Sequence, residues 1–294
     1  MPELPEVETV CRGLRPVMEN NTFVKVELRR ENLRIPFPEN FISSLENSTV
    51  TSVWRRAKYI LVELDSDEVL LMHLGMSGRF TIEEADIKTS QPGEFHNEIK
   101  NTPGGPHDHV VFHMSNGAII TYTDPRRFGL MTLFDANEMS EHRLLKNIGI
   151  EPLGNALSGE FLANCFENKK ANLKSALLDQ KNIAGLGNIY VCEALYRSSL
   201  SPLREAATLS RPKAQKCADA LATAIRNVLN DAVAAGGSSL NDYAQTNGEL
   251  GYFQHSFDVY GREGEACRRE NCVGKIKRIV QSGRSSFYCP RCQR

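Results

Sequence analysis

The sequence lacks several features that define whole classes of protein. None of its apolar runs approaches the roughly 18 residues that a membrane-spanning helix requires, which excludes an integral helical membrane protein and predicts no membrane partner. No basic segment followed by an apolar stretch stands near its start, so we expect no signal peptide and a cytoplasmic location. The chain has no internal repeat, and its net charge is only −1 at pH 7.

What remains is an ordinary globular composition. Hydrophobic residues make up 41% of the chain and charged residues 24%, as in a soluble protein. The 294 residues suffice for two domains, or for two domains and a small appendage. Nothing in the sequence indicates an oligomer, so we expect a monomer.

The eight cysteines are unevenly distributed. Four stand in apolar surroundings and are expected to be buried thiols: Cys11, Cys165, Cys192 and Cys217. The other four lie in the last 28 residues with the spacing C-x4-C-x16-C-x2-C: Cys267, Cys272, Cys289 and Cys292. Two close pairs separated by a β-prone stretch predict a reducing compartment and one four-cysteine structural Zn2+ site on a β-hairpin, in preference to two disulfides. A domain this small would depend on the metal for its folding energy.

The same C-terminal region is basic. Residues 261–294 hold nine Lys or Arg against three Glu, an excess of six positive charges, which indicates a polyanionic partner such as nucleic acid. The predicted hairpin tip, "QSGR", would present Arg284 on a rigid support. A solvated turn residue and a phosphate-binding arginine are both compatible with that position.

The periodicity of apolar residues changes near residue 138. Before it, a helix that starts at Pro5 is followed over 22–122 by strands with turn signals at 65–67 and at Asn116-Gly117, typical of a β-sandwich or barrel. After it, helical spacing marks five segments: 139–148, 158–168, 171–180, 188–198 and 210–236. The polar stretches 82–106 and 236–261 are expected to be loops, the first long and acidic.

The first residues carry an unusual amine. Removal of Met1 would leave the ring nitrogen of Pro2 as the chain's α-amine, whose pKa near 8, against about 10.4 for lysine, makes it uncharged far more often at pH 7. A secondary amine that attacks a sugar C1′ forms an iminium, and Glu3 beside it could manage the protons. Lys58, in the strand-like stretch "RRAKYI", is a further candidate for proton transfer, although an exposed edge explains its charge equally well.

Two further motifs are suited to contacts with the phosphates or bases of DNA. The glycine-rich "GLGNIY", at a helix start, offers backbone N–H groups to a phosphate, although tight helix packing also explains its glycines. "DPRRFG" places two arginines and a phenylalanine in a turn, where arginine can replace the hydrogen bonds of an orphaned base and phenylalanine can wedge between bases. A turn held by salt bridges is the alternative.

Taken together, the motifs closely resemble the formamidopyrimidine-DNA glycosylase family, whose bifunctional glycosylase/lyases remove oxidised purines. They occur in the family's order along the whole chain: "MPELPEVET", "RRAKY", "HLGMSG", "DHV", "DPRRFG", "GLGNIY" and "RSSFYCPRCQ". The resemblance implies an α+β multidomain chain with an N-terminal β-sandwich and flanking helices (1–136), a helical helix–two-turns–helix domain (137–240), a lesion-recognition loop and linker (241–261) and a β-hairpin zinc finger (262–294). The implied partner is double-stranded DNA that contains oxidised bases or abasic sites.

The resemblance also implies roles for individual residues. Pro2 resembles the Schiff-base nucleophile, Glu3 the acid/base, and Lys58 and Arg284 the residues that assist β- and δ-elimination. Void-filling and wedging positions match Met76, Arg126 and Phe128, with Arg127 adjacent. Phosphate-contacting positions match His107, Lys170, Lys174, Asn188 and Tyr260, and the Lys169/Lys170 alignment can slip by one residue.

Two alternatives remain at this point. An endonuclease VIII-like glycosylase for oxidised pyrimidines shares the fold, Pro2 and the zinc finger, but Leu4, Met76 in "HLGMSG" and the long lesion loop favour the purine enzyme. A non-catalytic zinc-finger DNA-binding protein explains the basic tail and leaves Pro2, Glu3 and Lys58 without a role. The stretch 82–106 is longer and more acidic than the family leads us to expect, which argues against a DNA contact there.

Overall fold

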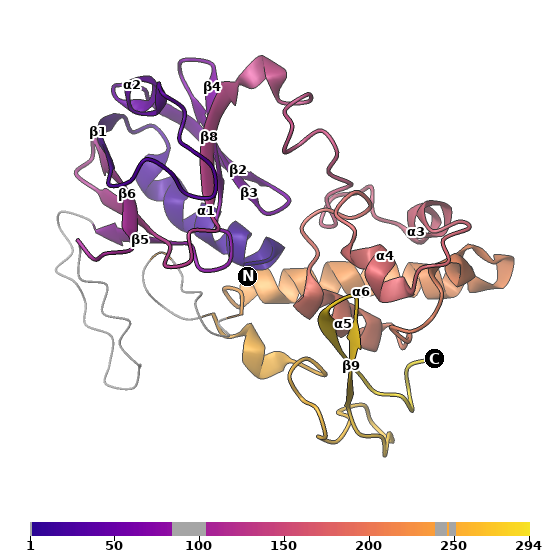
Figure 1. The fold of residues 1–294 in the computed structure, drawn as a ribbon. Helices are drawn as coiled ribbons and strands as arrows, with labels where there is room; N and C mark the ends of the chain where they lie inside the picture. Colours follow the sequence, from indigo (N-terminus) through magenta and orange to yellow (C-terminus); the bar gives the residue numbers. More distant parts are fainter. Residues whose placement is uncertain (1, 84–103, 239–245, 247–250) are drawn as a thin grey trace. The chain divides into compact units, whose positions relative to one another are not determined.

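The computed structural model describes residues 2–83, 104–238, 246 and 251–294. Most of the predicted acidic loop and part of the predicted lesion loop lie outside these residues. The chain divides into two compact units (Figure 1). Unit 1 comprises Met1–Pro2, Glu6–Leu145 and Ser238–Gly251, and unit 2 comprises Glu3–Pro5, Lys146–Gly237 and Tyr252–Arg294.

Unit 1 contains the β-sandwich, which confirms the predicted fold class. Its two four-stranded sheets have the orders β1-β6-β7-β5 and β2-β3-β4-β8, and every neighbouring pair is antiparallel. The first sheet consists of β1 (Phe23–Leu28), β5 (Arg79–Glu83), β6 (Asp108–Met114) and β7 (Ile119–Thr123). The second consists of β2 (Val50–Arg56), β3 (Tyr59–Leu64), β4 (Glu68–His73) and β8 (Leu130–Asp135).

One hydrophobic core joins both sheets to the helices of this unit. The helices are α1 (Leu4–Met18) and the short α2 (Phe41–Leu45). The α1 residues that recur on the predicted apolar face, Val7, Val10, Cys11 and Leu14, are at most 1% exposed and pack in this core. Burial of each such side chain contributes about 1.5–3 kcal/mol, so the stripe fixes which face of α1 points inward.

Two turns of unit 1 differ from the prediction. The apolar run at 50–64 is a hairpin, in which Ala57 and Lys58 form a two-residue turn between β2 and β3, with Ala57 at φ 55°. The chain has no Asn-Gly or Asp-Gly pair there to signal such a turn, so the prediction of a strand at Lys58 is wrong. The connection between β6 and β7 has four residues, 115–118, instead of two, with Gly117 at φ 84° in the left-handed region that glycine readily adopts.

Unit 2 is largely helical. It contains α3 (Gly159–Cys165), α4 (Leu173–Leu178), α5 (Asn188–Arg197) and α6 (Gln215–Ala234). Three of the short 3-10 segments, η2 (Ala206–Ser210), η3 (Pro212–Ala214) and η4 (Phe253–Ser256), also belong here. The predicted helix at 139–148 is wrong: after η1 (Ala136–Glu138), which Asp135 caps, this stretch forms turns. Only Leu145 in it is buried, so it has no apolar face to stabilise a helix.

The C-terminal hairpin also belongs to unit 2. β9 (Lys277–Gln281) and β10 (Arg284–Tyr288) pair antiparallel around Ser282 and Gly283, both at positive φ. This is the conformation of the tight turns that match the twist of a hairpin. Among the helices of the described ranges, none is long and apolar enough to cross a membrane.

Candidate active site and nucleic-acid interface

The Glu3 carboxylate lies at the N-terminus of α5. Its Oε1 accepts a hydrogen bond from the N–H of Ile189 at 3.1 Å, and the side chain is buried. Gly187, which precedes α5, makes this approach possible, because a Cβ there would lie 2.1 Å from Glu3 Cδ. The "GLGNIY" turn therefore holds a carboxylate at the positive end of a helix dipole, a position that favours negative charge.

The residues around Glu3 fix the start of the chain. Leu4 N–H donates to the Gly185 carbonyl at 3.2 Å, and the Leu4 side chain is fully buried in the helical core of unit 2. Gly185 adopts φ 76°, so this close approach suits glycine. Pro2 is buried and precedes α1. Met1 lies outside the described residues, and its removal stays a prediction.

Lys58 is buried in the β2–β3 turn, and its charge acts on His73 at the end of β4. Burial, with the positive charges of Lys58 and Arg34, lowers the pKa of His73 to about 4. The His73 Nδ1 accepts the Gly75 N–H at 3.0 Å, which requires an unprotonated nitrogen there. Sequence reasoning missed this neutral histidine, although it lies in the quoted motif "HLGMSG".

The predicted wedging residues come from two adjacent turns of unit 1. Met76 is half-buried in the turn between β4 and β5, while Arg126, Arg127 and Phe128 are exposed between β7 and β8. The Arg126 guanidinium lies 5.2 Å from the centre of the Phe128 ring, which is 46% exposed. The structure thus brings these predicted residues together on one surface of the sandwich. Their DNA contacts stay predictions.

Lys174 has a different environment from the one that a phosphate contact suggests. It is 1% exposed, and its Nζ donates to the Ser285 carbonyl at 2.8 Å and the Ser286 hydroxyl at 2.7 Å. Burial, with the charge of Arg284 close by, lowers the pKa of Lys174. Asn188 donates to the same Ser285 carbonyl at 3.0 Å. Lys174 and Asn188 therefore fix the hairpin strand that carries Arg284, whose own side chain is exposed.

Two other predicted phosphate contacts are exposed. Lys170 is exposed, whereas its neighbour Lys169 donates to the Asn182 side chain at 2.9 Å and lies over the Phe166 ring. Lys170 is thus the freer of the two for a ligand. His107 is exposed, and its carbonyl accepts the Asp124 N–H at 3.0 Å.

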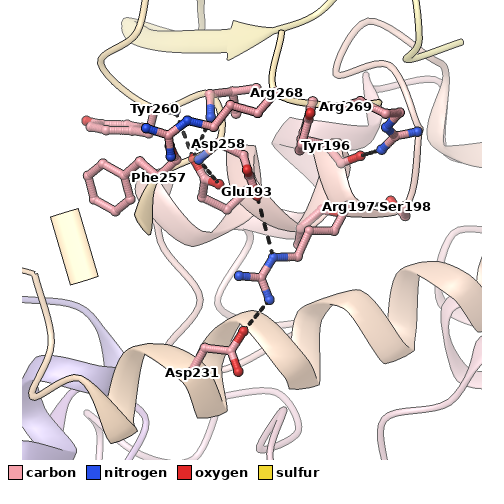
Figure 2. Close-up of polar contacts among 12 residues, drawn as sticks. Glu193, Tyr196, Arg197, Ser198, Asp231, Phe257, Asp258, Tyr260, Arg268 and Arg269 are labelled. Carbon is pink, nitrogen blue, oxygen red and sulfur yellow. Dashed lines mark hydrogen bonds and ion pairs between the residues drawn. The ribbon is translucent and has the colours of Figure 1, made fainter. Parts of the chain in front are cut away.

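A buried carboxylate holds the segment that carries Tyr260. Glu193 on α5 is fully buried and accepts the N–H groups of Asp258, Val259 and Tyr260 at 2.8–3.0 Å (Figure 2). Burial raises the pKa of Glu193, an effect that these amide bonds partly offset. Three charge-assisted bonds to consecutive amides fix the backbone at Tyr260. Sequence reasoning missed Glu193, because nothing local marks a carboxylate that bonds 65 residues away.

Arginines reinforce the same region. Arg268 donates to the Phe257 carbonyl at 2.8 Å, and Arg269 bonds to the Tyr196 carbonyl and the Ser199 hydroxyl. Arg197 pairs with Asp231 of α6 at 2.5 Å (Figure 2). Basic residues near the cysteines thus partly serve unit 2 itself, and the charge excess of the tail overstates what is available to DNA.

The four C-terminal cysteines fit a zinc ion. Their sulfur atoms all lie within 4.8 Å of one another, with 3.8 Å between Cys267 and Cys292 and 3.7 Å between Cys272 and Cys289. A regular tetrahedron with Zn–S distances of about 2.3 Å has S–S edges of about 3.8 Å. All eight cysteines are free thiols, with Cys11 and Cys192 buried as predicted but Cys165 and Cys217 only partly so.

These features define a class by fold: a β-sandwich unit, and a helical unit that carries a β-hairpin with a four-cysteine cluster. Three family models match the chain: the formamidopyrimidine-DNA glycosylase N-terminal domain at 1–131, the H2TH domain of the same family at 148–244, and a zinc finger found in FPG and IleRS at 264–294. Formamidopyrimidine-DNA glycosylases of Bradyrhizobium sp. (strain ORS 278) and Beijerinckia indica are 55% and 56% identical over all of both chains. The chain belongs to the formamidopyrimidine-DNA glycosylase family.

Solved structures of proteins named MutM or Fpg resemble this chain over nearly its full length. The MutM (Fpg) protein of Thermus thermophilus is 36% identical, with a TM-score of 0.81 over 99% of this chain and 98% of that one. A Lactococcus lactis FPG mutant in complex with Fapy-dG-containing DNA is 30% identical, with a TM-score of 0.83 over the whole of both chains. The L. lactis Fpg bound to DNA with an abasic site has a TM-score of 0.82 at 29% identity, over 99% of each chain.

Proposed function

We propose that this chain excises oxidised purines from double-stranded DNA and then cleaves the abasic strand through a covalent intermediate on Pro2. Membership of the formamidopyrimidine-DNA glycosylase family supports the glycosylase activity over the full length of the chain. Relatives in complexes with Fapy-dG and abasic DNA support the substrate and the DNA partner. The observation that carries the mechanism is the Glu3 carboxylate, fixed at the α5 N-terminus next in sequence to Pro2, whose nitrogen becomes a secondary amine when Met1 is removed.

The chemistry follows from these two residues. The target C1′ is inaccessible in a stacked duplex, so the nucleotide is turned out of the helix at a cost of a few kcal/mol. The neutral Pro2 nitrogen attacks C1′, the glycosidic bond breaks, and its electron pair leaves with the base, which takes up a proton. Glu3 protonates the sugar ring oxygen as the ring opens to an iminium.

The iminium drives strand cleavage. As an electron sink it acidifies the 2′ hydrogen, and removal of that proton expels the 3′ phosphate by β-elimination. A second elimination expels the 5′ phosphate and leaves a one-nucleotide gap. We assign Lys58 to the first elimination and Arg284 to the second. Lys58 is buried in its turn, and Arg284 is exposed on a hairpin that Lys174 and Asn188 fix.

DNA binding rests on basic side chains and on the wedge, which is the set Met76, Arg126 and Phe128. His107, Lys170 and Arg284 are exposed and suit phosphate contacts, and Lys174 still has one N–H beyond the two it gives to Ser285 and Ser286. Because such binding releases counterions, the affinity should fall steeply as salt rises. The four cysteines hold one structural Zn2+, which completes the finger and supplies no catalytic step because all four positions are thiolate.

The substrate assignment is tested by single-turnover excision. Duplexes that carry 8-oxoguanine, a formamidopyrimidine or an oxidised pyrimidine are incubated with excess protein, and the free base and the strand ends are both measured. The proposal predicts fast release of both purine lesions, with phosphate left on both sides of the gap. Faster release of the pyrimidine would favour the endonuclease VIII-like alternative, and DNA binding without any release would favour a non-catalytic binder. We also propose that the protein is cytoplasmic and monomeric and that Met1 is removed. Light scattering tests the monomeric state, and intact mass tests the removal of Met1.

A further inference from the structure

The Asp124 carboxylate is completely buried in unit 1, at the start of the "DPRRFG" turn. Its Oδ1 accepts the Ser77 hydroxyl at 2.6 Å. Its Oδ2 accepts the Gly129 N–H at 2.8 Å and the Tyr122 hydroxyl at 3.3 Å. All three donors are neutral, so hydrogen bonds rather than an ion pair compensate the cost of burying this group.

Two of the three donors, Ser77 and Gly129, belong to separate turns, and the third, Tyr122, lies on β7. Ser77 follows Met76, and Gly129 follows Phe128. The Ser77 oxygen in turn accepts the Arg126 N–H at 3.1 Å, so a single hydroxyl connects the two turns through both its donor and its acceptor positions. The carboxylate therefore bridges the segment that presents Met76 and the segment that presents Arg126 and Phe128.

The backbones of the two turns are also in direct contact. A Cβ on Gly75, which has φ 65°, would lie 2.4 Å from both the Gly129 nitrogen and the Phe128 carbonyl carbon. A Cβ on Gly129 would lie 1.9 Å from the Tyr122 hydroxyl. Van der Waals contact of this kind makes the two turns one rigid body, and the Asp124 bonds fix their relative register.

We propose that Asp124 is a positioning residue that couples the two turns, so that Met76, Arg126 and Phe128 enter the duplex as one unit. Its carboxylate is completely buried and acts through Ser77 and Gly129. The inference rests on the proposed function, because it takes from that function the role of the wedge. It adds the element that sets the spacing of the wedge.

Two substitutions interrupt the bridge at different places. In Asp124→Asn the carboxylate charge is lost and one oxygen becomes an NH2 group. Turned toward Gly129, this group loses that arm of the bridge, and turned toward Ser77 it reverses the bond, so that the hydroxyl accepts instead of donating and the charge-assisted bonds become weaker neutral ones. Ser77→Ala removes the hydroxyl and leaves the Gly129 arm intact. Asp135→Asn is the matched control, since that carboxylate is exposed and accepts its hydrogen bonds from the nearby Asn137.

The readout is unstacking of the duplex, which does not require excision. DNA with a non-cleavable tetrahydrofuran abasic analogue and an adjacent 2-aminopurine is saturated with protein, and the fluorescence rise is measured. We expect the wild type and Asp135→Asn to give the full rise, and Asp124→Asn and Ser77→Ala to lose at least about half of it. In a Met76→Ala background either substitution should cause no further loss, because coupled residues are not additive.

The same variants are then assayed for excision of 8-oxoguanine. Misplacing a positioning group costs up to about 100-fold in rate, and we expect a loss of at least about 10-fold. The inference is overturned if Asp124→Asn and Ser77→Ala keep the full fluorescence rise, or if they lose the same fraction again in the Met76→Ala background. Absence of excision by the wild type alongside a normal fluorescence rise counts against the proposed function and not against the coupling.

Discussion

His73 should make unit 1 sensitive to acid by a calculable amount. Its pKa is lowered from 6.5 to about 4, chiefly by burial and then by the charges of Lys58 and Arg34. A histidine whose folded pKa lies below its unfolded pKa favours the unfolded chain when protonated. Its stabilising contribution is therefore fully present above pH 6.5 and is lost as the pH falls toward 4. From these two pKa values, the loss is about 2 kcal/mol at pH 5 and about 3 kcal/mol at pH 4.

The substitution His73→Asn isolates this contribution. The asparagine oxygen can still accept the Gly75 N–H, but the side chain cannot be protonated. Urea unfolding from pH 7 to pH 4 is followed through the fluorescence of Trp54, the single tryptophan, which lies on β2 of unit 1. The wild type should lose about 2–3 kcal/mol more than the variant over this range. Parallel pH profiles for the two proteins would show that His73 does not cause the acid sensitivity, and so would an NMR titration of His73 with a midpoint near 6.5.

The remaining predictions concern unit 2. Gly187→Ala should displace Glu3, whose Cδ would lie 2.1 Å from the new Cβ, and should reduce excision by about 100-fold while DNA affinity is kept. Gly154→Ala, whose new Cβ would make ordinary contacts, is the control. Unchanged excision by Gly187→Ala would contradict the role of Glu3. Lys174→Met should lower the unfolding free energy by about 1–2 kcal/mol through loss of its bonds to the hairpin at Ser285. An unchanged stability in thermal denaturation would show that Lys174 does not fix the hairpin. Chelation of Zn2+ should abolish DNA binding in a gel-shift assay and zinc should restore it, whereas a chelator saturated with zinc beforehand should have no effect.

Features with a local signal were predicted from the sequence. The α1 stripe follows from helical periodicity, and the hairpin tip at Ser282-Gly283 from its glycine. The cysteine spacing predicted a cluster that the sulfur positions confirm. In each case the residues that specify the structure form a regular or closely spaced pattern along the chain, so the pattern is visible in a single sequence.

Features that depend on distant partners were missed. Lys58 lies in a turn because Ala57 adopts a positive φ within the β2–β3 pairing, although alanine gives no turn signal. Glu193 is a buried carboxylate on an apolar helix, and only the fold supplies the amides at 258–260 that compensate its charge. The phosphate contact of Lys174 came from the resemblance and stays a prediction, whereas its bonds to Ser285 and Ser286 join residues more than 100 positions apart and have no local signal. Pairings over such separations cannot be read from local patterns.

The most direct test of the central claim is borohydride trapping followed by mapping of the adduct. The protein is incubated with a duplex that contains 8-oxoguanine in the presence of borohydride, which reduces an iminium to a stable amine, and the cross-linked peptide is identified by mass spectrometry. We expect a covalent protein–DNA adduct on the nitrogen of Pro2 in a chain that lacks Met1, and no adduct when the N-terminus is blocked. An adduct on a lysine, or trapping by the N-terminally blocked protein, would contradict it.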